Sequence, residues 1–261
     1  MSLDQPADLV KHETRTRDAF LGGRLTLSQP GNGFRAGLDS VLLGAAVPAG
    51  TTTLLDLGAG IGAAGLVTLA LGRAERAVLA EREPGALALA AENVADNGFA
   101  ARARVVDVDV TASGAARRAA GLLDNDHDVV IANPPFFAAG QGTLATRADR
   151  ADARHMAKGE LDLWLRCAAA AASANGRCIV IYPAEGLADL LAAFERRFGA
   201  ITILPLAPRP GLAANRVLVA GIKGSRGKLS LLATRFMHGE TGNGFAPQFD
   251  AIFRGEHALD W

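Results

Sequence analysis

TLLDLGAGIG, residues 53–62, joins an apolar run to three closely spaced glycines. The apolar run predicts a buried strand, and a helix is expected from Ala63 onward. Gly58, Gly60 and Gly62 allow the backbone to turn tightly between the two elements and to approach a ligand closely. We therefore take this stretch as the start of an α/β domain and as its first candidate binding loop.

Short β-rich runs alternate with longer Ala- and Leu-rich stretches on the C-terminal side of this loop. Strands are expected at residues 53–57, 77–81, 104–107, 128–132, 177–182 and 200–206. Helices are expected at residues 63–71, 84–97, 160–174 and 184–198. Residues 216–222, with 228–232, are expected to form a last strand or a hairpin. The alternation predicts a doubly wound, mostly parallel sheet with helices on both faces.

Length and composition limit the possible classes of protein. The chain has 261 residues, which suits one domain (51–261) preceded by a lead-in segment (1–50), and its 27 basic and 27 acidic side chains cancel. Cys167 and Cys178 form no C-x-x-C pair, the five histidines are scattered, and the longest apolar stretch is too short for a bilayer, which needs ~20 residues. We expect a cytoplasmic protein without a metal site or membrane segment; the sequence leaves monomer and dimer open.

Three acidic residues follow or end successive predicted strands near the glycine loop. Gly58, Gly60 and Ala63 also satisfy a dinucleotide fingerprint, in which Glu81 at the end of the second strand would hold an adenosine ribose. Asp56 would meet the ammonium of a methionine group but would repel a pyrophosphate, and Asp109 could accept from an adenine amino group. The set favours S-adenosylmethionine over NAD; the alternatives are a simple tight turn and solvated loop acids.

The motif Asn133-Pro134-Pro135-Phe136 directly follows the apolar run 128–132. An exocyclic amine on an aromatic ring is a poor nucleophile because its lone pair is delocalised. The Asn133 side-chain carbonyl and the Pro134 main-chain carbonyl can accept its two N–H bonds and stabilise the positive charge that develops on nitrogen. Phe136 can stack on a flipped base. The alternative is an Asn-Pro turn that ends a strand, with the phenylalanine in the core.

Together these motifs resemble the class I methyltransferases that modify amino groups. Residues 29–43 (QPGNGFRAGLDSVLL), 150–155 (RADARH), 208–219 (PRPGLAANRVLV) and Lys223-Gly224 resemble the bacterial tRNA adenine-N6 methyltransferase family, which modifies valine tRNA beside the anticodon. The resemblance covers nearly the whole chain. It implies a seven-stranded sheet with a final antiparallel strand, and it implies that residues 1–50 supply a lid in which Arg35, Gly37 and Asp39 lie over the cofactor.

Basic residues suggest where RNA phosphates would bind. No acidic residue occurs between Glu195 and Glu240, a stretch that includes Arg209, Arg216 and Lys223. A second basic group lies in the long segment after the catalytic motif: Arg147, Arg150, Arg154 and His155. One-signed charge of this kind suits a phosphate backbone, and sparse aromatics favour a structured RNA such as tRNA. The alternative is solvated charge that keeps the domain soluble.

Two other functional classes stay open. One is a methyltransferase with another acceptor: a small-molecule hydroxyl, a protein glutamine amide or a guanine amine. The hydroxyl version would need a general base or a metal, and no such group stands near Asn133 in the sequence. The other is a non-catalytic module that binds cofactor or RNA; a dehydrogenase is a distant third. The sequence does not indicate which RNA or nucleotide is modified, or the role of residues 137–158.

Overall fold

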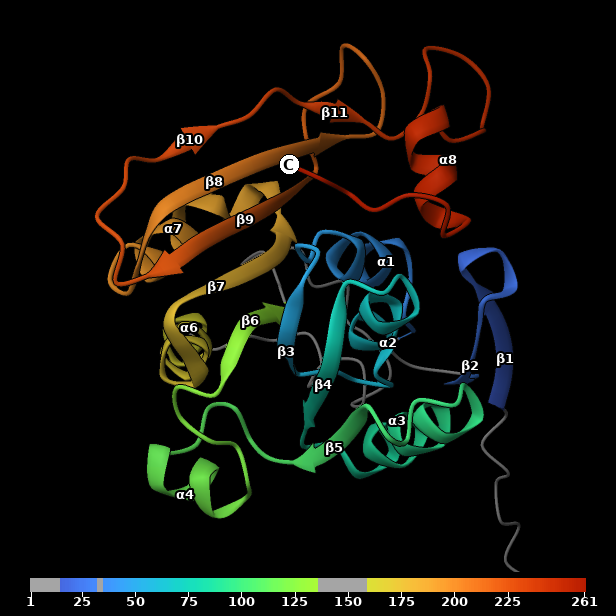
Figure 1. The fold of residues 1–261 in the computed structure, drawn as a ribbon. Coiled ribbons are helices and arrows are strands. Elements are labelled where there is room, and N and C mark those ends of the chain that lie inside the picture. The colour runs from blue at the N-terminus through green and yellow to red at the C-terminus, as the bar shows by residue number, and fades with distance from the viewer. Residues whose placement is uncertain (1–14, 32–34, 136–158) are drawn as a thin grey trace, which may run out of the picture.

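The computed structural model describes residues 15–31, 35–135 and 159–261. A long twisted sheet runs through this part of the molecule (Figure 1). The sheet has nine strands in the order β10-β8-β9-β7-β6-β3-β4-β5, with β11 also paired to β8. Two strands have only two residues each, so seven longer strands form the body of the sheet. The strands are β3 (Thr51–Leu57), β4 (Ala74–Glu81), β5 (Ala103–Asp107), β6 (His127–Ala132), β7 (Ala172–Pro183), β8 (Phe198–Ala207), β9 (Arg216–Lys223), β10 (Ser230–Leu231) and β11 (Arg235–Phe236).

The seven long strands run parallel with one exception. β9 pairs antiparallel with both β7 and β8 and lies between them. The expected mostly parallel sheet with a final antiparallel strand is confirmed. The expected hairpin between 216–222 and 228–232 is wrong, because both edges of β9 are already occupied by β7 and β8. β10 instead pairs parallel with the outer edge of β8.

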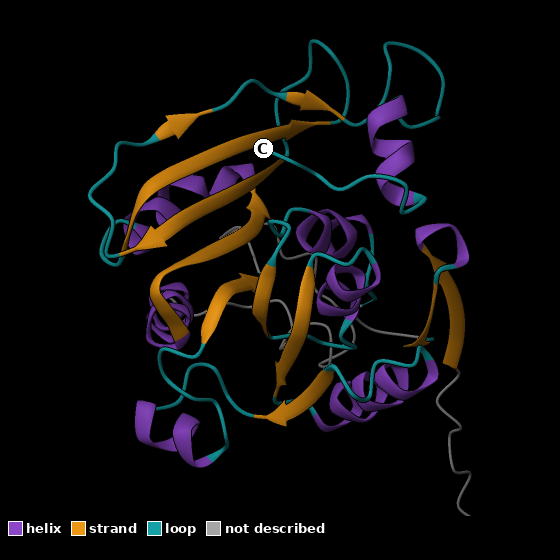
Figure 2. Cartoon of the chain, viewed as in Figure 1, coloured by secondary structure: helices purple, strands orange, loops and turns teal. Residues whose placement is uncertain are grey.

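Helices cover both faces of the sheet (Figure 2). Adjacent residues of β3 show the two faces: Leu54 packs in the core with α1, α2 and α3, whereas Leu55 packs in the core with α6 and α7. This alternation follows from the two-residue repeat of a strand. The helices are α1 (Leu38–Ala45), α2 (Ala63–Ala70), α3 (Pro84–Asp96), α4 (Gly114–Ala119), α6 (Glu160–Ala171), α7 (Leu187–Phe194) and α8 (Pro247–Phe253).

Two predicted helices are shorter than expected. α6 ends at Ala171 rather than residue 174, because Ala172 turns extended and pairs with His127 of β6. The segment 184–198 begins with a separate 3-10 turn, η2 (Ala184–Gly186), and α7 then ends at Phe194. In both places strand pairing or packing overrides the helix preference of alanine and leucine.

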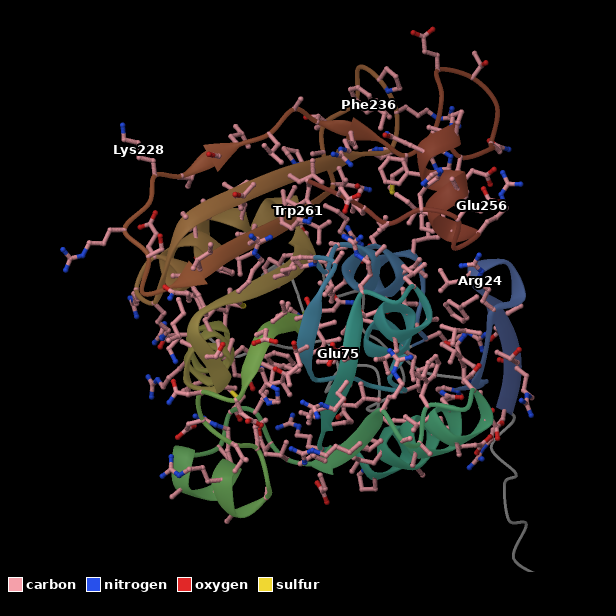
Figure 3. The ribbon with its side chains drawn as sticks, in the orientation of Figure 1. Arg24, Glu75, Lys228, Phe236, Glu256 and Trp261 are labelled. Atoms are coloured by element: carbon pink, nitrogen blue, oxygen red, sulfur yellow. The ribbon has the colours of Figure 1, made fainter. Side chains whose placement is uncertain are left out.

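The lead-in forms a hairpin of β1 (Arg15–Phe20) and β2 (Leu25–Pro30), joined by the 3-10 turn η1 (Leu21–Gly23). Leu25 and Leu27 of β2 are fully buried in the core that also contains α2 and α3. At the hairpin tip, Arg24 donates to the carbonyl oxygen of Gly255 just after α8 (2.6 Å). Figure 3 shows Arg24 on the side of the hairpin that faces the segment around Glu256. The hairpin is therefore packed onto the domain on two sides. In the part of the chain described, no helix is long and apolar enough to cross a membrane.

Candidate cofactor and acceptor site

Strand register brings the predicted motifs to one edge of the sheet. Leu57 of β3 pairs with Ala80 of β4 and with Ala132 of β6. The residues that directly follow these three in the chain are Gly58, Glu81 and Asn133. The glycine loop therefore lies between the acidic end of β4 and the Asn-Pro-Pro motif. Parallel α/β sheets bind ligands at this carboxyl edge. The alternation of strands and helices does not by itself fix this order; the pairing does.

Gly58 is where the glycine loop approaches its neighbours most closely. Its φ is +64°, and a Cβ built there would lie 2.3 Å from Cη2 of Trp164 on α6. Gly60 has φ +56°, but its Cβ would meet no atom of the described residues within 4 Å. The loop is therefore packed on one side by Trp164 and open at Gly60. Sequence reasoning missed Trp164, although it lies in the predicted helix at residues 160–174.

Glu81 is held firmly beside the loop. Its Oε2 accepts from the backbone N–H of Gly60 (2.8 Å), and its Oε1 accepts from those of Arg82 (2.8 Å) and Glu83 (2.9 Å). Three backbone donors fix the carboxylate at the end of β4, where it can accept from hydroxyl groups of a ribose. This geometry fits the nucleoside part of a cofactor.

Asp56 is almost completely buried beneath the loop, with 2% of its surface exposed. Its Oδ2 accepts from the backbone N–H of Gly65 in the first turn of α2 (2.9 Å). Burial raises the pKa of this carboxyl to about 7, although the Gly65 hydrogen bond lowers it. In the structure Asp56 therefore fastens the start of α2, and its charge near neutral pH depends on what binds next to it.

Asp109 lies two residues beyond the end of β5. Its Oδ1 accepts from the backbone N–H (2.8 Å) and the hydroxyl (2.6 Å) of Thr111, and its Oδ2 pairs with Arg82 (3.1 Å). Burial opposes ionisation, but the hydrogen bonds from Thr111 and Arg82 hold the pKa of Asp109 below its usual value. The carboxylate is ionised near neutral pH and faces the same edge as Glu81.

Asn133 and Pro135 are half-buried, and Pro134 between them is buried. The Asn133 side chain makes no hydrogen bond to any other residue that the structure describes. Among the described residues, none occupies its carbonyl oxygen or its amino group. Phe136 lies outside the described residues, so its stacking role stays a prediction.

Of the three predicted lid residues, Arg35 and Gly37 lie between β2 and α1, and Asp39 lies in the first turn of α1. Arg35 donates to Thr16 (2.9 Å) and Pro30 (3.0 Å) and pairs with Asp18 of the hairpin (2.5 Å). Gly37 is the N-cap of α1, and Asp39 in the first turn pairs with Arg216 at the start of β9 (2.9 Å). The segment is tied to the hairpin at one end and to the start of β9 at the other. Its position over a cofactor stays a prediction.

The basic residues of the tail divide between the two edges of the sheet. Arg216 pairs with Pro183 and Leu206 at the carboxyl edge, and Arg209 follows β8 there, where it donates to the carbonyl oxygens of Gly239 and Gly242. Lys223 lies at the other end of β9, where its Nζ donates to Asn125 and Ala172 (both 2.7 Å). The structure therefore separates Lys223 from the site. Arg147, Arg150, Arg154 and His155 lie outside the described residues.

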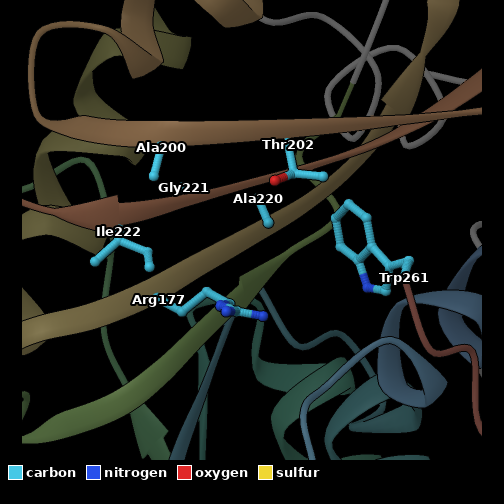
Figure 4. A pocket seen from close by; sticks show the side chains of 7 residues that line it. All are labelled: Arg177, Ala200, Thr202, Ala220, Gly221, Ile222 and Trp261. Carbon is cyan, nitrogen blue, oxygen red and sulfur yellow. The ribbon is translucent and has the colours of Figure 1, made fainter. Parts of the chain in front are cut away.

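Two pockets of about 200 and 330 Å³ lie away from this edge, and Figure 4 shows the smaller one. Both are lined by Arg177 and Trp261, which Figure 4 shows beside the strands β7, β9 and β8. Arg177 pairs with Val129 and Ile222, near the amino end of the parallel strands. The described residues that line these pockets include none of the predicted site residues.

Comparison with protein families and curated proteins agrees with this geometry. Residues 36–165 match the model of the methyltransferase small domain. A tRNA1(Val) (adenine(37)-N6)-methyltransferase from Dickeya chrysanthemi is 31% identical over 205 residues, which cover 76% of this chain and 77% of that protein. One of the same description from Tolumonas auensis is 30% identical and covers 84% of this chain and 87% of its own length.

Solved structures show the same fold. A predicted O-methyltransferase from Agrobacterium tumefaciens has a TM-score of 0.72 and 34% identity, over 85% of this chain and 99% of that one. A 16S rRNA N2 G1207 methyltransferase from T. thermophilus, solved with AdoMet and guanosine, has a TM-score of 0.56 and 20% identity, over 84% of this chain and 53% of that one. The second likeness concerns the fold alone.

Proposed function

The chain belongs to the tRNA1(Val) (adenine(37)-N6)-methyltransferase family, and on that premise we propose that it transfers a methyl group from S-adenosylmethionine to the N6 amine of an adenine in tRNA. One observation carries the proposal: the pairing of β3 with β4 and β6 sets a candidate cofactor loop directly beside the Asn133 amide.

The residues around the loop fit this cofactor. Glu81 is fixed to accept from the ribose hydroxyls, and the open side of Gly60 lets the ligand approach the backbone. Asp109, held as an anion, is suited to accept from the adenine amino group. When bound, S-adenosylmethionine supplies an electrophilic methyl group on a sulfonium centre.

Asn133 and Pro134 prepare the acceptor. The amine N–H groups donate to the Asn133 side-chain oxygen and the Pro134 carbonyl oxygen, so the nitrogen lone pair turns away from the ring and toward the methyl group. As positive charge develops on nitrogen, these fixed dipoles stabilise it. A methylated ammonium conjugated to an aromatic ring is acidic enough to release its extra proton to water, so no residue has to act as a strong base.

The same chemistry separates an amine acceptor from a hydroxyl acceptor. The Agrobacterium protein, described as a predicted O-methyltransferase, makes the comparison necessary. A hydroxyl must lose its proton as it attacks, which requires a base or a metal-bound alkoxide. The Asn133 amide accepts hydrogen bonds but does not take up a proton, and this supports an amine.

Structured RNA is the proposed partner. Arg216 and Arg209 lie at the carboxyl edge beside the acceptor side of the site. Although both make contacts within the chain, both residues are only half-buried and retain exposed surface for phosphates. We further propose that the protein works in the cytoplasm, where its RNA substrate would be encountered.

The test is transfer of labelled methyl from S-adenosylmethionine to unmodified total tRNA, followed by nucleoside analysis. We expect N6-methyladenosine in the digest, and we expect the Asn133→Ala protein to bind cofactor but to form labelled nucleoside far more slowly. Label in 2′-O-methyl nucleosides would indicate the hydroxyl acceptor. Cofactor binding without label in RNA would direct the search to a protein amide or a small molecule.

A further inference from the structure

Asn93 of α3 connects the glycine loop to the lead-in hairpin. The side chain is completely buried. Its Nδ2 donates to the carbonyl oxygen of Ile61 in the glycine loop (3.0 Å) and to that of Ser28 in β2 (3.1 Å). Its Oδ1 accepts from the backbone N–H of Ser28 (2.7 Å). One side chain therefore satisfies backbone groups of two segments that lie far apart in the sequence.

Asn97, the C-cap residue one turn after Asn93, also binds β2 but not the glycine loop. Its Oδ1 accepts from the N–H of Thr26 (3.0 Å), and its Nδ2 donates to the carbonyl oxygen of Thr26 (2.9 Å). Thr26 and Ser28 are alternate residues of β2, so the two asparagines present donors and acceptors to β2 much as a neighbouring strand would. Asn97, however, has no hydrogen bond to the glycine loop.

From Ser28 the connection continues toward α1. The next residue, Gln29, is buried; its Oε1 accepts from the N–H of Ala36 (2.8 Å) and its Nε2 donates to Asp18 (2.8 Å). Asp18 in turn pairs with Arg35. Hydrogen bonds, together with the peptide bond between Ser28 and Gln29, thus connect Ile61 to residues 35 and 36, close to the Asp39–Arg216 pair.

We propose that Asn93 is a positioning residue that couples the cofactor loop to the hairpin and to residues 35–37, so that bound cofactor steadies the segment next to the acceptor. This inference rests on the proposed function, because it takes S-adenosylmethionine as the ligand of the loop. The two ends of the network share a single buried side chain, and buried amides left without partners are costly. A loop held in its bound form therefore favours one arrangement of β2.

Hydrogen exchange and cofactor binding test the coupling. In the unaltered protein, S-adenosylmethionine should slow amide exchange in residues 25–31 and 35–37 as well as in the glycine loop. Asn93→Ala should bind cofactor about tenfold more weakly, as expected for one lost buried hydrogen-bonding group, and at saturation should show no cofactor-dependent slowing in the hairpin. Asn97→Ala is the matched control: it removes a similar grip on β2 and should keep both the affinity and the slowing.

Each result separates the possibilities. Equal effects of Asn93→Ala and Asn97→Ala would overturn the coupling and leave Asn93 a general packing residue. If Asn93→Ala does not fold, the unaltered protein still tests the coupling. Cofactor binding without slower exchange in residues 25–31 would overturn the coupling but not the proposed function. No binding of S-adenosylmethionine to the unaltered protein would instead contradict the proposed function.

Discussion

The half of the sheet edge proposed to hold the cofactor (the cofactor half, at β3, β4 and β5) differs from the half proposed to take the acceptor (the acceptor half, at β6, β7 and β9). In the cofactor half, Asp56, Glu81 and Asp109 each accept hydrogen bonds from nearby backbone or side-chain donors. In the acceptor half, the Asn133 side chain has no hydrogen-bond partner among the described residues. The carboxylates of the cofactor half are thus held by neighbouring groups, whereas the Asn133 amide is held by no other residue that the structure describes.

The strongest test of this contrast is Asn133→Ala. We expect the rate of methyl transfer to fall by about 100- to 1,000-fold, as for the loss of a preorganised dipole at a reacting centre. The dissociation constant for S-adenosylmethionine should change by less than about twofold, since Asn133 holds no other described residue in place. Single-turnover assays and calorimetry measure the two quantities. Equal losses in rate and cofactor affinity would show that the halves are not separate.

A pair of glycine variants tests how tightly the cofactor half is built. Gly58→Ala should lower the free energy of unfolding by about 2–4 kcal/mol, because the new Cβ combines positive φ with a clash against Trp164. Gly60→Ala has the same φ cost but no clash, so a loss of about 1 kcal/mol is expected. Denaturant unfolding gives both values. Similar losses for the two variants would mean that Trp164 does not constrain the loop.

The pH dependence of Asp56 separates its structural role from cofactor binding. Burial raises its pKa to about 7 from an ordinary 3.8, so the folded protein keeps a proton that the unfolded chain has already lost. Its contribution to stability is therefore greatest below pH 3.8 and falls as pH rises toward 7. The ammonium group of S-adenosylmethionine would pair with the ionised form of Asp56. Cofactor affinity should therefore rise by up to about tenfold for each unit that the pH increases below the pKa.

Asp56→Asn is the control for this prediction and should remove both pH dependences. Stability curves and cofactor titrations from pH 5 to 8 would show them. If stability varies with pH but cofactor affinity does not, the role of Asp56 is limited to holding the start of α2 in place.

The smallest expected effect concerns the two ends of β9. Arg216→Ala should raise the KM for tRNA by roughly fivefold and reduce its salt dependence, in keeping with loss of about one phosphate contact. Lys223→Ala should change KM by less than about twofold, because Lys223 lies at the opposite edge. Steady-state assays at two salt concentrations compare them. A larger effect of Lys223→Ala would place the RNA across the other edge of the sheet.

Several elements were predictable because their signals are local. Apolar runs located each long strand of the sheet, and glycines or Pro84 marked the start of α2 and α3. Helix α1 was not predicted, because its first residues were assigned to the lid that the family resemblance implies. Short α4 and α8 were missed as well. Trp164 and Asn93 were overlooked because their partners, Gly58 and Ile61, are remote in sequence.

The sequence by itself determined which chemical groups follow which strands: the glycines after β3, Glu81 at the end of β4 and Asn133 after β6. Local backbone preferences and motif spacing suffice for that. Only the tertiary structure decided which groups meet, since strand pairing sets Gly58 between Glu81 and Asn133. The tertiary structure also separated the basic residues of the tail, because Arg216 and Lys223 lie at opposite ends of the eight-residue strand β9. An extended strand places them about 23 Å apart, however close they stand in the sequence.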